Sequence, residues 1–334
     1  MKFTKIIALL LAVMTVMALA ACGTTKPSDD TAKTPDTANA GDKTYKVGVC
    51  QLVQHPALDA ATKGFVTALK DKLGDKVEID EQNASGESAT CATIVNQFVS
   101  NSYDLIMANA TPALQSAVSA TDTIPIVATS ITDYASALGI DNWTGKTGMN
   151  VTGTSDLAPL DQQAKMFTEL LPDVKTVGIV YCSSEANSKY QADVVEAELG
   201  KLGFAVKIYT FADSNDIASV VTNACSECDA LYVPTDNKLA EAAEIVDGVT
   251  SPAGIPVIAG EAGICKGCGI ATLSIDYYSI GYAAGVQAYD ILVNGKDAGD
   301  IEIGFASDLT KQYSPERCTA LNITVPEGYE PLGD

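Results

Sequence analysis

Small polar and acidic side chains recur in short segments that each follow a β-branched apolar run. Carboxylates in such segments can bind an ammonium group, while hydroxyls and the free N–H groups of a helix start can bind a carboxylate. This pattern predicts noncovalent binding of a small polar solute. The segments contribute His55, Asp59, Thr111, Thr129, Ser130, Asp133, Ser183, Ser184, Glu185, Asn187, Asp236, Asn237 and Glu261.

Helix capping is the alternative role for each of these residues taken singly. We expect Thr111 and Ser184 to cap helices in addition to any role in binding. For the three carboxylates Glu185, Asp236 and Glu261, capping remains an open alternative to binding a solute.

Catalysis fits the sequence less well than binding. His55 is the one histidine of the chain, so no nucleophile–histidine–acid set is expected to form around it. Two of the acidic residues could act as an acid–base pair. However, no phosphate-binding glycine-rich loop or dinucleotide fingerprint follows a strand. We therefore expect no catalytic residues, no cofactor and no enzyme activity.

Two Cys-x-x-Cys pairs, residues 225–228 and 265–268, have more than one interpretation. Four thiolates could hold a zinc ion, whereas cysteines outside the cytoplasm commonly form disulfides. We favour disulfides, which would involve most of eight cysteines in an unassigned pairing, and expect no metal site. These cysteines are Cys50, Cys91, Cys182, Cys225, Cys228, Cys265, Cys268 and Cys318.

Strand-like and helix-like patterns alternate from Lys46 onward. This alternation predicts βαβ units with a parallel sheet. Thr111 is expected to be an N-cap, with Pro112 in the first turn of its helix. The expected strands are 47–50, 77–80, 105–108 and 124–128, and the expected helices include 58–73 and 87–100.

Three segments then recur in the same order at a nearly constant offset. Residues 46–50, 104–109 and 124–130 resemble residues 176–180, 229–234 and 255–261. The repetition predicts an α/β fold of two Rossmann-like lobes with parallel sheets. Solutes bind outside the carboxyl ends of such strands, so the polar segments should converge on one cleft.

Several crossover strands should join these lobes as a hinge. Segments 148–154 and 270–275 are expected to cross, and a long helix should run from Asp276 to near Gly295. The spacing of Gly281 and Gly285 indicates close helix packing. The N-terminal lobe is therefore expected to comprise 45–154 and 276–300, and the C-terminal lobe 155–275 and 301–334.

An export signal precedes the expected lobes. Lys2 and Lys5 are followed by the apolar stretch 6–20, which is short for a membrane span, and by Leu-Ala-Ala-Cys-Gly at 19–23. This lipobox predicts a signal peptide over 1–21 and lipid attachment at Cys22, with an ordinary cleaved signal as the alternative. Residues 23–44 are expected to form a disordered tether. The predicted location is the extracytoplasmic face of the cell membrane.

The charge balance excludes one class of partner. The 334-residue chain has 21 basic and 42 acidic residues, a formal net charge of −21. Such a surface repels nucleic-acid phosphates, so no nucleic-acid partner is expected.

Several segments together resemble the ABC-transporter substrate-binding family that includes tryptophan and tyrosine uptake lipoproteins. The resemblance spans roughly 45–306. It implies a type I periplasmic-binding fold, lobe closure on a small solute, an ABC transporter permease as partner, and no catalysis; we expect a monomer. Besides the lipobox, the segments are 55–59, 110–113, 183–187, 234–237, 260–261 and 275–278.

The resemblance implies an amino acid as the solute, with an aromatic one as the candidate. The solute's carboxylate is expected at Thr111, Thr129 and Ser130, and its ammonium at Glu185 and Asp236, with Asn187 and Glu261 in support. Its side chain would lie against Leu58 and His55, with Tyr277 stacking on it, and Ser184 completes the set. A sugar or nucleoside is the rival solute, and a solute-sensing lipoprotein is the rival function.

Overall fold

The computed structural model describes residues 43–333. The predicted signal peptide, the predicted lipid-attachment site Cys22 and nearly all of the predicted tether lie outside the described residues. Within the described part, no helix has both the length and the apolar character needed to cross a membrane.

The first sheet has six strands, all in parallel pairs. Their order is β11-β5-β4-β3-β1-β2. The strands are β1 (Tyr45–Gln51), β2 (Val77–Asn83), β3 (Leu105–Asn109), β4 (Ile126–Ile131), β5 (Val151–Ser155) and β11 (Gly304–Phe305). The helices of this first lobe are α1 (Pro56–Leu73), α2 (Ser88–Ser100), α3 (Thr111–Ala120), α4 (Tyr134–Leu138) and α11 (Tyr277–Asn294).

The second sheet has seven strands in the order β13-β12-β10-β9-β8-β6-β7. Only β12 runs antiparallel to its neighbour β10. The strands are β6 (Thr176–Cys182), β7 (Ala205–Phe211), β8 (Ala230–Val233), β9 (Val257–Ala259), β10 (Ala271–Ile275), β12 (Leu309–Tyr313) and β13 (Glu330–Pro331). The helices of this second lobe are α5 (Leu160–Leu170), α6 (Ala186–Lys201), α7 (Ile217–Glu227), α8 (Asn237–Glu241), α9 (Ala243–Ala253), α10 (Ala262–Cys268) and α12 (Pro315–Ala320).

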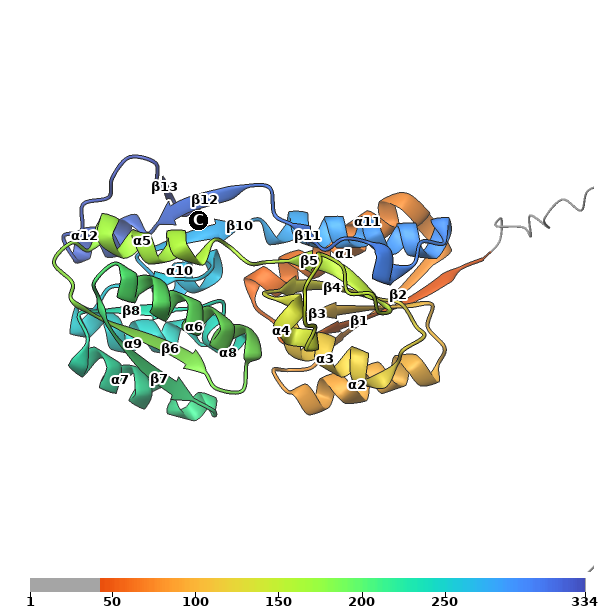
Figure 1. Ribbon diagram of the computed structural model, residues 1–334, viewed down its shortest axis with the longest axis horizontal. Coiled ribbons are helices and arrows are strands. Elements are labelled where there is room, and N and C mark those ends of the chain that lie inside the picture. Colours follow the sequence, from red (N-terminus) through yellow and green to blue (C-terminus); the bar gives the residue numbers. More distant parts are fainter. Residues whose placement is uncertain (1–42, 334) are drawn as a thin grey trace, which may run out of the picture. The chain divides into compact units, whose positions relative to one another are not determined.

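The chain passes between the two sheets three times (Figure 1): after β5, after β10 and after β11. The predicted α/β fold with two sheets joined by crossovers is confirmed. The last boundary was predicted wrongly, because Gly304 pairs with Thr154 and residues 304–305 thus belong to the first sheet. The return to the second sheet comes after Phe305 rather than at residue 301.

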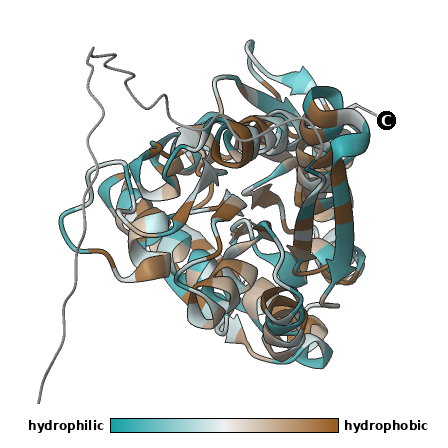
Figure 2. Cartoon of the chain, turned by 90° about the vertical axis from the view of Figure 1, so that its right-hand side faces the viewer, coloured by the Kyte–Doolittle hydropathy of each residue, from teal (hydrophilic) through white to brown (hydrophobic). Residues whose placement is uncertain are grey.

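Apolar side chains cover both faces of each sheet. In the first lobe, Phe98, Ile106 and Leu114 pack on one face, while Phe65 and Met107 pack on the other. Figure 2 shows brown, hydrophobic segments on the central strands and both brown and teal segments on the surrounding helices. Each large apolar side chain buried in this way contributes about 1.5–3 kcal/mol. These cores hold the carboxyl ends of the strands in fixed positions.

Helices α1 and α11 pack at very close range. A Cβ atom on Gly281 would lie 2.0 Å from the carbonyl oxygen of Ala61, and one on Gly64 would lie 2.1 Å from that of Tyr278. Gly285 faces Phe65 and Ala68 in the same way. The close helix packing predicted for Gly281 and Gly285 is therefore confirmed. It fixes the start of α11 against the first lobe.

The prediction of disulfides is wrong for the structure, in which the eight described cysteines are all free thiols. Residues 43–333 also contain no cluster of His, Cys, Asp and Glu side chains that could hold a metal ion. Cys182, Cys228, Cys265 and Cys268 instead pack in one apolar core of the second lobe. A buried thiol behaves there as a small apolar side chain. Burial raises the pKa of Cys268 to about 12, which keeps it protonated.

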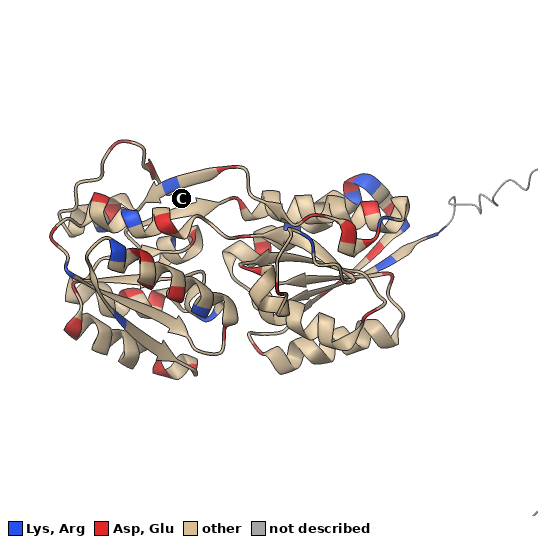
Figure 3. Cartoon of the chain, in the orientation of Figure 1, with Lys and Arg blue, Asp and Glu red and all other residues tan. Residues whose placement is uncertain are grey.

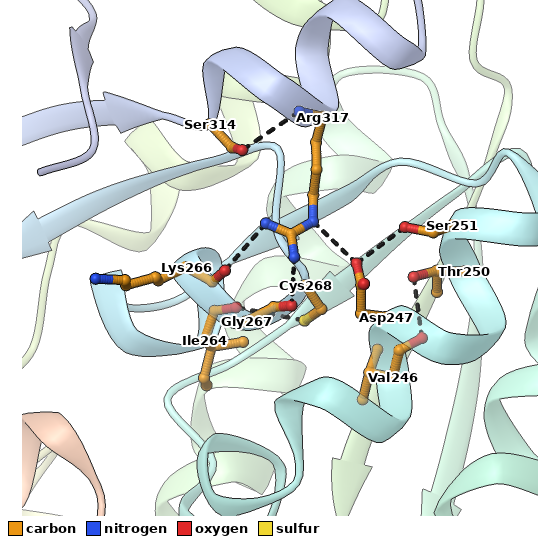
Figure 4. Close-up of polar contacts among 10 residues, drawn as sticks. All are labelled: Val246, Asp247, Thr250, Ser251, Ile264, Lys266, Gly267, Cys268, Ser314 and Arg317. Carbon is orange, nitrogen blue, oxygen red and sulfur yellow. Dashed lines mark hydrogen bonds and ion pairs between the residues drawn. The ribbon is translucent and has the colours of Figure 1, made fainter. Parts of the chain in front are cut away.

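Arg317 attaches the C-terminal helix α12 to two other helices (Figure 4). Its Nε donates to Asp247 Oδ1 of α9 at 2.9 Å, and its Nη1 and Nη2 donate to the carbonyl oxygens of Lys266 and Gly267 at 3.0 and 2.5 Å. The guanidinium therefore binds carbonyls at the end of α10 that have no intrahelical partner. The N-terminal end of the same helix, α10, follows its N-cap residue Glu261.

Candidate functional site

The carboxyl ends of β1 and β3 lead into α1 and α3 without side-chain caps, whereas Asp133 caps α4 after β4 by accepting from the Ser136 N–H at 2.7 Å. His55 is the N-cap residue of α1 and Ala110 that of α3, and neither makes a side-chain cap hydrogen bond. The N-cap of α3 was predicted at Thr111, but the structure places it one residue earlier, at Ala110, whose φ is positive; Thr111 is therefore the first helical residue. The N–H groups of both first turns thus remain free of a capping side chain at the carboxyl edge of the sheet.

Two non-glycine residues at these strand ends have left-handed backbone geometry. Ala110 has φ 86° and Ser130 has φ 57°. The Ala110 N–H donates to the Thr129 carbonyl oxygen at 3.1 Å, so the ends of β3 and β4 are joined. Such a conformation costs about 1–3 kcal/mol per residue and is concentrated at functional sites.

Unpartnered buried polar atoms gather at the same edge. Six buried side-chain polar atoms of the described residues have no hydrogen-bond partner, and a buried unpaired group costs about 1–3 kcal/mol. Four of the six lie at strand ends or helix starts, three of them on predicted site residues and the fourth on Asn109, which was not predicted. They are His55 Nδ1, Asn109 Oδ1, Ser130 Oγ and Asn187 Oδ1. These atoms can donate to or accept from a solute.

Three further first-lobe residues of the predicted site are buried, and two of them make hydrogen bonds within the protein. The Thr129 hydroxyl lies 2.9 Å from that of Thr154, which also donates to the Ile280 carbonyl oxygen of α11. Leu58 is buried in the first-lobe core, and its carbonyl oxygen accepts from Asn109 Nδ2 at 2.8 Å. Thr111 is buried at the start of α3.

Asp236 and Glu261 cap second-lobe helices. Asp236 accepts from the N–H of Leu239 at 2.9 Å and from that of Cys182 at 2.7 Å. Glu261 accepts from the N–H of Gly263 at 2.6 Å and from that of Ile264. Burial raises the pKa of Glu261 to about 7, and burial with the nearby Glu185 charge raises that of Asp236. The capping interpretation therefore holds for both residues.

Glu185 is also bound by backbone N–H groups, here those of another helix. It accepts from the N–H of Asn237 at 3.0 Å and from that of Lys238 at 3.1 Å, and from the Asn237 side chain at 2.6 Å. Asn187 Nδ2 donates to it at 3.2 Å. Glu185 thus joins the starts of α6 and α8. Ser184 lies outside this buried set, since it is exposed and its hydroxyl lies 3.0 Å from the Cys182 sulfur.

Sequence analysis missed Asp156, a buried carboxylate in the first crossing segment. Asp156 is 6 % exposed, and its oxygens accept from the hydroxyls of Tyr277 at 2.9 Å and Thr132 at 3.2 Å. Burial raises the pKa of Asp156 to about 6. It directly follows Ser155 at the carboxyl end of β5. The strand-end rule could have found it had the rule been applied to the crossing strand.

Gln191 of α6 was missed as well. Its Nε2 lies 3.3 Å from Thr132 Oγ1 of the first lobe, and its Oε1 accepts from the Thr235 N–H at 3.1 Å. His55 makes a second contact between lobes, with Nε2 lying 3.3 Å from Asn237 Oδ1. Buried polar contacts therefore connect the carboxyl ends of the two sheets.

A family model described as ABC transporter substrate binding protein matches residues 46–329. The chain belongs to this family, in agreement with the resemblance in its sequence. Such proteins bind a substrate outside the cytoplasm without converting it, so the chain is a substrate-binding protein and not an enzyme. Its two-sheet architecture is the type I periplasmic-binding fold.

Three relatives are similar over most of their length. A tyrosine-binding protein from Clostridioides difficile is 36% identical and is covered over 96% of each chain. A structure from Streptococcus pneumonia in complex with L-Trp has 34% identity and a TM-score of 0.82, covering 85% of this chain and 97% of that one. A ligand-free, open substrate-binding protein with adhesive properties from Clostridium difficile has 35% identity and a TM-score of 0.66, covering 87% and 100%.

Proposed function

We propose that this chain is the lipid-anchored receptor of an ABC importer and captures a free amino acid, with L-tryptophan and L-tyrosine as the leading candidates. The observation that carries the proposal is the set of unpartnered buried polar atoms at the carboxyl ends of the strands, between two lobes that also bury carboxylates.

A zwitterion matches the charge arrangement of this region. The first lobe offers the uncapped N–H groups in the first turn of α3, which begins at Thr111, and the Ser130 hydroxyl; both suit a carboxylate. Buried acidic side chains, which suit an ammonium, lie next to them and across the lobes. A sugar would satisfy the hydroxyl and amide groups but would leave the buried carboxylates without a cation.

An aromatic side chain is supported by the relatives. One is described as a tyrosine-binding protein, and another has been solved with L-Trp bound. His55, Leu58 and Tyr277 are the buried residues proposed to contact the solute's ring, since apolar and aromatic surface suits such a group.

Closure of the two lobes is proposed as the capture step. The L-Trp complex and the open, ligand-free relative have nearly equal identity to this chain, yet their TM-scores are 0.82 and 0.66. A different arrangement of similar lobes lowers such a score without any change of fold. The three crossings between β5, β10, β11 and the following elements would serve as the hinge.

Membrane attachment is proposed at Cys22, on the extracytoplasmic side, where a monomeric receptor would pass its solute to a permease. The lipobox at 19–23 supports this part of the proposal. Metabolic labelling with a fatty acid tests it, because a Cys22→Ala variant should take up no label. Equal labelling of both proteins would remove the anchor from the proposal.

Titration calorimetry on the purified protein tests the solute. We expect saturable binding of L-tryptophan or L-tyrosine, and no binding of glucose or adenosine at the same concentrations. Binding of glucose or adenosine alone would overturn the amino-acid assignment. Uptake of labelled solute by cells with and without the gene then separates import from sensing, because a sensor would leave uptake unchanged.

A further inference from the structure

We infer that Asp156 is the residue that receives the ammonium group of the solute, and that Tyr277 is its positioning residue. The inference deepens the proposed function and rests on its claim that the solute is an amino acid. It differs from the assignment made on sequence, which gave this role to second-lobe carboxylates.

The second-lobe carboxylates are engaged by backbone N–H groups. Each oxygen of Asp236 and of Glu261 accepts from a backbone N–H group, and both oxygens of Glu185 accept from the first N–H groups of α8. An ammonium at any of these would compete with helix caps, which contribute about 0.5–2 kcal/mol each.

Asp156 is bound differently. Its side-chain partners are the hydroxyls of Tyr277 and Thr132, which are able to rotate toward other acceptors. None of the ion pairs found among residues 43–333 includes Asp156. A buried carboxylate without a cation is costly, and a ligand ammonium would supply the missing charge.

The position of Asp156 suits a group that carries both charges on one carbon atom. Its N–H donates to the Ile131 carbonyl oxygen at 3.2 Å, directly beside Ser130 and its unpartnered hydroxyl. Strands β4 and β5 are neighbours, and adjacent strands lie about 4.8 Å apart. The carboxylate and ammonium of a single amino acid can therefore reach Ser130 and Asp156 at the same time.

The same position connects binding with closure. Tyr277 begins α11 immediately after the second crossing, and Thr132 follows β4. Gln191 of the second lobe contacts the Thr132 hydroxyl that donates to Asp156. A solute held by Asp156 would thus lie where both lobes and two crossings meet. The Tyr277 hydroxyl fixes the carboxylate orientation, which makes it a positioning residue.

Calorimetry with matched analogues tests the inference. The probes are L-tryptophan and 3-indolepropionic acid, which lacks only the amine, or L-tyrosine and 3-(4-hydroxyphenyl)propionic acid if tyrosine binds better. Asp156→Asn should lower affinity for the amino acid about 30-fold or more and leave that for the amine-free analogue within a few-fold. Tyr277→Phe should also lower the affinity for the amino acid relative to that for the amine-free analogue, but by a smaller factor.

Asp276→Asn is the matched control, because Asp276 is an exposed carboxylate next to Tyr277 that caps α11. Its affinity ratio should equal that of the parent, and thermal unfolding should show that all variants are folded. If Asp156→Asn binds the amino acid as tightly as the parent does, the inference is wrong but the proposed function stands. The same holds if Glu185→Gln or Asp236→Asn, rather than Asp156→Asn, loses the preference for the amino acid over its amine-free analogue. A parent protein that binds neither amino acid would overturn the proposed function as well.

Discussion

His55 Nε2 lies 3.3 Å from Asn237 Oδ1, which places a first-lobe helix start against a second-lobe helix start. Asn237 Nδ2 donates to Glu185 at 2.6 Å, so its oxygen is the atom that faces the imidazole. Nε2 must then carry the proton, and the unpartnered Nδ1 is an acceptor.

This contact predicts that His55 stabilises the closed form. His55→Ala should weaken binding of the amino acid by about 1 kcal/mol, or several-fold, because one hydrogen bond between lobes is lost. Calorimetry measures the affinity, and solution scattering at saturating solute measures closure. Gln115→Ala, on an exposed first-lobe residue of α3, is the control and should bind as the parent does. Unchanged affinity in His55→Ala would exclude a role in closure.

The buried acids predict an unusual pH dependence of stability without solute. Burial raises the pKa of Asp156 from 3.8 to about 6 and that of Glu261 from 4.5 to about 7. Because the folded pKa exceeds the unfolded one, the folded state binds more protons between these values, and stability falls as pH rises through this window. The free energy of unfolding should therefore be greater near pH 5.5 than near pH 8.

His55 acts in the opposite direction. Burial lowers the pKa of His55 below 6.5, so its contribution to stability is lost as the pH falls below that value. Urea unfolding from pH 5 to 8 measures the combined effect of the acids and His55 on the free energy of unfolding. In His55→Gln, stability should increase more steeply as the pH is lowered. Asp156→Asn should reduce the dependence mainly below about pH 6, because the folded and unfolded states differ in protonation of Asp156 between pH 3.8 and about 6. A parent protein that is most stable at pH 8 would contradict the assignment of buried, uncompensated acids.

Gly281→Ala tests the packing of α1 against α11. The added Cβ would lie 2.0 Å from the Ala61 carbonyl oxygen, so the helices must separate, at about 1–3 kcal/mol of stability. Gly200→Ala is the matched control, since Gly200 is also helical and has open space where a Cβ would be. It should stabilise by up to about 1 kcal/mol through helix propensity. Equal effects in urea unfolding would show that the contact is not close.

Arg317→Ala should destabilise the second lobe by about 1–3 kcal/mol. The change removes hydrogen bonds to Asp247 and to two carbonyls at the end of α10. Lys165→Ala removes an exposed ion pair to Asp161 and should change stability by less than about 0.5 kcal/mol. Charged residues are spread over the helices, loops and strands of both lobes (Figure 3), and the contrast compares the three-partner contact of Arg317 with an ordinary exposed pair. Similar losses in both variants would argue against a structural role for Arg317.

The periodic parts of the fold were predictable from sequence. The patterns at 58–73 and 87–100 correspond to α1 and α2, because each presents an apolar face at helical spacing. Strand β11 was not predictable, since two residues carry no periodicity. The disulfide prediction failed for a different reason: an extracytoplasmic compartment permits disulfides, but only the fold determines whether two cysteines have the spacing and orientation that a disulfide requires.

The site was predictable as a region and less so by residue. The strand-end rule led to Ser130, His55 and Asn187, whose side chains have unpartnered buried atoms. It could not show that Ser184 is exposed, because the exposure of a loop residue depends on the neighbouring chain. Asp156 was overlooked because the strand-end rule was not applied to β5. In the sequence β5 was treated as a connection between lobes, whereas in the structure it is also a member of the first sheet.

The threefold passage between sheets also sets the order in which the protein can fold. Helix α11 and strand β11 complete the first lobe, but they are synthesised after β6 to β10 of the second. Contacts such as Ala61 with Gly281 join distant parts of the chain, and long-range contacts of this kind slow folding. Strand β5 remains an unpaired edge of the first sheet until residue 305 has been synthesised. Strand β10 remains an unpaired edge of the second sheet until β12 has been synthesised. Neither lobe can therefore complete its sheet until most of the chain has been synthesised.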